Sequence, residues 1–180
     1  MMKATGVVRR IDDLGRIVIP KEIRRTMRIR EGDPLEIFTD KDGGVVFKKY
    51  SLMGGLSDFA GQMCDTLAKL SGLTAVIVDR DNVLSVTGAP RRDLNERPIS
   101  EELEKLMENR QLYVRQSGDA QLAVCRDSER YHITVCAPIL SGGDVLGAVL
   151  FVAEDDQTVG ETETKMIQTA AGFLSRHMEE

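Results

Sequence analysis

The chain has 180 residues, of which 42% are hydrophobic and 29% charged, and its net charge is −5 at pH 7. This composition is typical of one medium-sized or two small globular domains and excludes a mostly disordered chain. No apolar run reaches the about 20 residues of a membrane-spanning helix, and no secretory signal is recognisable, so we expect a cytoplasmic protein without a membrane partner. Three cysteines without a CxxC pair exclude a disulfide framework.

The charges are divided unevenly along the chain. Residues 1–50 carry a net charge of +4, whereas residues 51–180 carry −9. Within residues 1–30, nine basic side chains face only three acidic ones. A basic end on an acidic protein is typical of a segment that meets a polyanion, the alternative being an uneven but merely solvated surface.

The first fifty residues predict a small, mostly extended domain. Two strands, 5–11 and 16–19, flank a turn at 12–15 in which Gly15 adopts a positive φ. A short helix from Pro20 to about Arg28 and a closing hairpin with strands 35–39 and 45–50 follow. The segment has too many apolar side chains to expose and too few for a compact monomer, so we expect two chains to share one core as a dimer.

The short, glycine-containing segment 51–55 indicates a linker. The helix and strand patterns of residues 56–180 predict an α+β domain of antiparallel strands between helices. Apolar residues at 56, 60, 63, 67 and 70 give the first helix one apolar seam, which indicates either a contact with a second copy or packing within the chain. Ser100 is the expected N-cap of a middle helix, and a last helix covers 160–177. The predicted strands are 74–79, 82–87, 121–126, 131–139 and 145–153.

The helix that begins at Pro20 carries the clearest functional pattern. At about 100° per residue, its basic side chains fall within an arc of about 100°, opposite Ile23 and Met27, which suit a core. The adjoining strands and turn add further arginines, whose planar forks suit phosphates and guanine edges. We therefore expect a two-fold symmetric, arginine-rich surface for double-stranded DNA, the alternative being a solvated basic face. The candidate DNA-binding residues are Arg9, Arg10, Arg16, Lys21, Arg24, Arg25 and Arg28.

Residues 1–50 closely resemble the DNA-binding domain of the AbrB family of bacterial transition-state regulators. The matching elements, all at that family's spacing, are Thr5-Gly6, Asp13-Leu14-Gly15-Arg16, Ile19-Pro20, Ile23-Arg24-Arg25 and Leu35-Glu36-Ile37. The resemblance implies a swapped-hairpin dimer that forms one barrel. It also assigns DNA contacts to Arg9, Arg16, Arg24 and Arg25, with Arg10 in the same patch.

An AbrB-like head followed by an α+β domain is similar to sporulation regulators whose second domain is GAF-like. That resemblance implies a nucleoid-associated transcriptional activator and repressor of forespore genes, assembled as a tetramer through helices of the GAF-like domains. The cyclic-nucleotide signature Asn-Lys-Phe-Asp of some GAF domains is missing, so an effector stays unassigned and a purely structural role stays open. An antitoxin that shares the head fold, and an enzyme in the second domain, are the alternatives.

The remaining residues indicate no catalytic or metal site. His132 and His177 have no cysteine or second histidine at ligand spacing, so we expect no metal. Cys125 and Cys136 lie in strand patterns and are expected to be small buried side chains without an orienting catalytic motif. We therefore predict a protein that is not an enzyme and has no resident cofactor.

Overall fold

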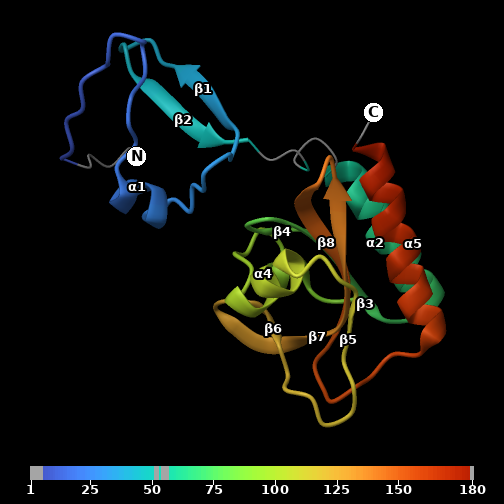
Figure 1. Ribbon diagram of the computed structural model, residues 1–180. Coiled ribbons are helices and arrows are strands. Elements are labelled where there is room, and N and C mark those ends of the chain that lie inside the picture. Colours follow the sequence, from blue (N-terminus) through green and yellow to red (C-terminus); the bar gives the residue numbers. More distant parts are fainter. Residues whose placement is uncertain (1–5, 51–52, 54–56, 179–180) are drawn as a thin grey trace. The chain divides into compact units, whose positions relative to one another are not determined.

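The structure is a computed structural model that describes residues 6–50, 53 and 57–178 (Figure 1). The chain forms two compact units, the first ending at Tyr50 and the second beginning after it. No helix in the described ranges is long and apolar enough to cross a membrane.

Most of the predicted linker, 51–55, lies outside the described residues, as does Leu56 of the predicted seam. Met53 is described, and its side chain is buried in the apolar core of the second unit. The second unit therefore includes part of the segment that the sequence assigns to the linker.

The first unit contains helix α1 (Lys21–Thr26) and a hairpin of β1 (Leu35–Thr39) and β2 (Val45–Lys49). The two strands are antiparallel, and Ile37 lies opposite Phe47. The predicted hairpin is thus present, whereas the helix ends two residues earlier than the apolar pattern suggests.

The two strands predicted at 5–11 and 16–19 are not formed within the described part of this single chain. Residues 6–12 and 16–19 run without strand pairing on either side of a turn, and one backbone bond, from the Asp12 N–H to the Arg16 carbonyl at 3.0 Å, joins them. The physical reason is that a strand needs a neighbouring strand, and within the described residues of the first unit β1 and β2 pair with each other. The turn itself is as predicted, with Gly15 at φ 75°.

Apolar side chains of the first unit remain in solvent when one chain stands alone. Val8 is 90% exposed and Val18 70%, although both belong to β-branched segments that suit a buried strand. Met27, which the sequence assigns to a core, is 56% exposed. Met27 is thus not buried by the described part of its own chain, and its assignment to a core that two chains share stays a prediction.

The second unit is larger and has a closed core. Its elements are α2 (Ser57–Ser71), β3 (Thr74–Asp79), β4 (Val83–Thr87), α3 (Arg91–Leu94), α4 (Glu101–Glu108), β5 (Tyr113–Val114), β6 (Ala123–Cys125), β7 (Ser128–Ser141), β8 (Asp144–Ala153) and α5 (Glu161–His177).

The strands of the second unit form one antiparallel sheet in the order β4-β3-β8-β7-β5, and β6 also pairs with β7. Helices α2 and α5 lie side by side on one face of the sheet, and α4 lies on the other (Figure 1). Each face has its own buried apolar cluster. Strand β8 contributes to both clusters, because its side chains alternate between the faces and it pairs with β3 and β7.

Most predicted elements of the second unit are present. Ser100 caps α4, its hydroxyl accepting the N–H of Leu103 at 3.0 Å, and Gly72 follows α2 at φ 72°. The segment 88–98, to which the sequence pattern assigns no helix or strand, contains the one-turn helix α3. This turn forms because Pro90 starts it and Leu94 is fully buried in the α4-side cluster.

Candidate nucleic-acid interface

Helix α1 presents Lys21, Arg24 and Arg25 to solvent. The three positions fall within an arc of about 100° on the helix surface. Among the described residues, no carboxylate lies within ion-pair distance of any of the three charged groups. Pro20, at φ −57° and ψ 147°, is the N-cap and leaves these side chains on the first turns of the helix. The helix thus carries three adjacent charges without local neutralisation.

Arg16 is held by a carboxylate at the turn before α1. Its Nε donates to Oδ2 of Asp12 at 2.9 Å, and its backbone N–H donates to Oδ1 at 2.8 Å. These two bonds hold the pKa of the Asp12 carboxyl below its usual value, and the backbone bond has the larger effect. The Arg16 side chain is 69% exposed despite the ion pair. The turn therefore presents the Arg16 side chain to solvent while its Nε is held by the Asp12 carboxylate.

Arg9 and Arg10 are exposed in the extended segment that precedes the same turn. Neither forms an ion pair with another described residue. The turn separates these two arginines from Arg16 along the chain. The structure therefore places the candidate arginines in two local groups, one around the turn and one on α1.

Arg28 departs from the helical stripe in which the sequence places it. The helix ends at Thr26, and Arg28 has a left-handed backbone with φ 51°. Its carbonyl accepts Lys49 Nζ at 2.8 Å, which ties the end of the helix to β2. Its side chain is half-buried, with one terminal nitrogen buried and without a hydrogen-bond partner among the described residues.

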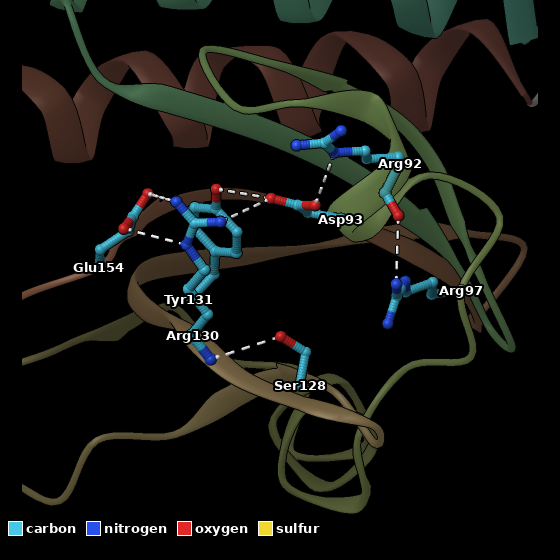
Figure 2. Close-up of polar contacts among 7 residues, drawn as sticks. All are labelled: Arg92, Asp93, Arg97, Ser128, Arg130, Tyr131 and Glu154. Atoms are coloured by element: carbon cyan, nitrogen blue, oxygen red, sulfur yellow. Dashed lines mark hydrogen bonds and ion pairs between the residues drawn. The ribbon is translucent and has the colours of Figure 1, made fainter.

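The second unit contains an arginine network that sequence reasoning missed. Arg130 on β7 donates to both carboxylate oxygens of Glu154 at 3.1 Å and to Asp93 of α3 at 2.9 Å (Figure 2). The same Asp93 oxygen accepts the Tyr131 hydroxyl at 3.4 Å. The Arg130 bonds hold the pKa of Glu154 below its usual value. The network fastens the α3 turn to the end of the sheet.

A half-open cavity of about 630 Å³ lies between α2, β4 and the α3 segment. Its volume is that of a small-molecule pocket, but its lining is mostly polar and acidic rather than apolar. The charged side chains that line it are Asp58, Asp65, Asp79, Arg91 and Glu96. No cue in the sequence joins these residues, since they come from three separate segments.

The cysteines are buried, as the strand patterns predict for Cys125 and Cys136. Burial raises the pKa of Cys64 and of Cys136 to about 12, and that of Cys125 to about 11. All three therefore stay protonated at neutral pH and are poor nucleophiles. The described ranges contain no group of three or more His, Cys, Asp or Glu side chains that could hold a metal ion.

The chain is similar to bacterial regulators along its whole length. A family described as "Stage V sporulation protein T C-terminal, transcription factor" matches residues 55–179. The chain is 49% identical over 179 residues to stage V sporulation protein T of Bacillus subtilis (strain 168), a match that covers 99% of this chain and 100% of that protein. It is 46% identical over 71 residues to the transition state regulatory protein AbrB of the same strain, covering 39% of this chain and 72% of that protein. These relatives confirm the resemblance seen in the first fifty residues.

Two further similarities concern the separate units. A family described as "Antidote-toxin recognition MazE, bacterial antitoxin" matches residues 8–52. The crystal structure of the GAF domain from Acinetobacter phosphoenolpyruvate-protein phosphotransferase has a TM-score of 0.54 at 13% identity, covering 73% of this chain and 84% of that one. At that identity the likeness shows the fold alone. It confirms the GAF-like architecture that the resemblance to sporulation regulators implies.

Proposed function

The chain belongs to the family of stage V sporulation protein T, and from that membership we propose that it regulates transcription by binding duplex DNA through the basic face of its first unit. It is accordingly a transcription factor and not an enzyme. The observation that carries the proposal is the group of three exposed cations on α1, none of them neutralised by a described carboxylate. Such a face attracts phosphates through counterion release. The proposed contact residues are Arg9, Arg10, Arg16, Lys21, Arg24, Arg25 and, as the least exposed member, Arg28.

We further propose that residues 1–50 of two chains form one swapped-hairpin barrel. The support is the apolar surface that a single chain leaves open, in which Val8, Ile11 and Val18 are each at least 66% exposed. Residues 8–12 and 16–19, which belong to no strand within the described part of one chain, would gain strand partners from the second copy. The resulting two-fold symmetry matches that of duplex DNA and doubles the number of cations on the binding face.

The second units are proposed to join two such dimers into a tetramer through α2 and α5. On the outer side of these helices, Phe59, Phe173 and His177 form a stack with ring centroids 5.4–6.3 Å apart. Phe173 is 52% exposed and Leu70 74%. At about 100° per residue, Leu70 lies on the same side of α2 as Phe59. An aromatic and aliphatic surface of this kind is typical of an interface core.

In the cell we propose that this tetramer acts on the nucleoid of the forespore cytoplasm, activating some genes and repressing others. A role as an antitoxin receives less support from the structure, because residues 57–178 form a packed domain rather than the extended tail that a toxin partner usually binds. The DNA-binding head at 1–50 and the regulatory unit at 56–180, with Met53 of the predicted linker 51–55 packed in the core of that unit, complete the proposal.

The proposal is tested by DNA affinity across a salt series. The Arg24→Ala/Arg25→Ala variant should bind a duplex selected by the wild-type protein from a randomised pool more weakly. Its log–log salt slope should be shallower by about 0.9 for each phosphate that the variant no longer neutralises. The matched control is Arg91→Ala/Arg92→Ala, which removes the same charge from an exposed Arg-Arg pair of the second unit. Equal affinities and slopes for the two variants would contradict DNA binding through α1.

A further inference from the structure

We propose that Asp12 is a positioning residue, which holds the Arg16 guanidinium in the orientation in which it contacts DNA. The inference rests on the proposed function, because it concerns how one of the proposed contact residues is presented. An acidic side chain on a DNA-binding surface repels the phosphates and so weakens binding. We therefore expect Asp12 to favour binding in another way.

The Asp12 carboxylate makes three hydrogen bonds across the turn, and both of its oxygens are used. Oδ1 accepts the backbone N–H groups of Leu14 at 3.0 Å and Arg16 at 2.8 Å, and Oδ2 accepts Arg16 Nε at 2.9 Å. The backbone adds a bond from the Gly15 N–H to the Asp12 carbonyl at 3.0 Å. One side chain thus fixes both the turn and the guanidinium that projects from it.

The neighbouring Asp13 supplies the contrast. It is exposed, and its carboxylate forms no hydrogen bond or ion pair with another described residue. Two adjacent carboxylates therefore carry the same charge at the same turn, and only that of Asp12 contacts Arg16. Any effect that arises from charge alone should be shared by both residues.

The geometry leaves the functional end of Arg16 free. The bond to Asp12 uses Nε, whereas the two terminal nitrogens have no acceptor among the described residues. The terminal edge of a guanidinium is the fork that binds phosphate or the O6 and N7 atoms of guanine. Because the side chain is already ordered before DNA arrives, less rotamer entropy is lost on binding. Asp12 therefore favours the complex although its charge opposes it.

The test compares Asp12→Asn with Asp13→Asn, since each removes one negative charge. Asparagine at 12 keeps the Oδ1 acceptor for the two backbone N–H groups and replaces only the oxygen that accepts Arg16 Nε. We expect Asp13→Asn to bind the selected duplex as tightly as wild type or tighter. Asp12→Asn should bind it about 3- to 10-fold more weakly, the cost of ordering one free side chain. Binding to bulk calf-thymus DNA should not weaken in either variant.

Arg16→Ala separates the inference from the proposed function. If Arg16→Ala leaves affinity unchanged, the proposed DNA contact of Arg16 is wrong. If Arg16→Ala weakens binding but Asp12→Asn behaves like Asp13→Asn, the positioning role is wrong. In the Arg16→Ala background, Asp12→Asn should cause no further loss, because the two residues act as one unit.

A measurement on the wild-type protein guards against a variant that disturbs the turn. The Nε–H resonance of Arg16 should be resolved and slow to exchange in the full-length protein without DNA, as expected for a donor held by a carboxylate. An Arg16 Nε–H that exchanges as fast as those of Arg24 and Arg25 would overturn the proposal, whatever the variants do.

Discussion

Replacing Phe173 with serine tests the proposed contact between second units of different chains. Phe173 stacks on Phe59 at 5.7 Å yet keeps 52% of its surface in solvent. We expect the variant to form dimers through its first units but no tetramer. The reason is that the exposed part of the ring is buried only when a second copy covers α2 and α5.

The size of the effect follows from the exposed area. A buried aromatic side chain covers roughly 200 Å², so about 100 Å² per ring is left for the interface. At about 25 cal/mol per Å², two symmetry-related rings contribute about 5 kcal/mol. This corresponds to about three to four decades in the dissociation constant of the tetramer.

Sedimentation velocity across a dilution series measures that constant directly. The control is Gln168→Ser, an exposed position about 140° round α5 from Phe173, which should leave the tetramer unchanged. Far-ultraviolet circular dichroism checks that both variants keep their helices. A Phe173→Ser protein that dissociates no more readily than wild type would refute the assignment of this face, as would equal dissociation of the control.

Four further outcomes are expected. Gly15→Val should weaken DNA binding, because a β-branched side chain is strained at φ 75°, and a gel-shift titration with unchanged affinity would contradict this. The native thiols should resist a thiol reagent at pH 8 and react after denaturation, since burial raises the pKa of Cys64 and Cys136 to about 12. The unfolded chain releases these thiol protons above pH 9, the ordinary pKa of a cysteine, whereas the folded chain keeps them up to about pH 12. The free energy of unfolding should therefore fall as the pH rises from about 9 toward 12, which urea titrations at each pH would show. Ser100→Ala should lower that free energy by about 1–3 kcal/mol in urea unfolding, because the helix cap and the bond to the Ala123 carbonyl at 2.7 Å are removed together; Ser100→Thr should retain most of both.

The second unit could be predicted from sequence because its signals are local. Ser100 stands directly before an apolar helical pattern, and its hydroxyl does cap α4. Gly142 and Gly143 separate two apolar runs, and both adopt the positive φ of a tight turn between β7 and β8. In each case the residue that decides the structure lies next to the element it ends or begins.

Other features depend on partners that the local sequence does not contain. The strands predicted at 5–11 and 16–19 are not formed among the described residues of one chain, so their β-branched composition is not sufficient. Arg28 leaves the helical stripe where its carbonyl meets Lys49, 21 residues away. The ion-pair network of Arg130 joins Asp93 and Glu154, which lie 37 and 24 residues away along the chain. The hydrophobic periodicity of a sequence gives no information about such long-range contacts.

The burial of Met53 decides where a fragment of the second unit has to begin. Tyr50 donates its backbone N–H to the Pro34 carbonyl at 3.0 Å and belongs to the first unit, whereas the Met53 side chain is packed in the core of the second. A fragment that starts at residue 56, where the helical pattern begins, would lack this side chain and leave a cavity in that core. A fragment that starts at residue 51 would keep it.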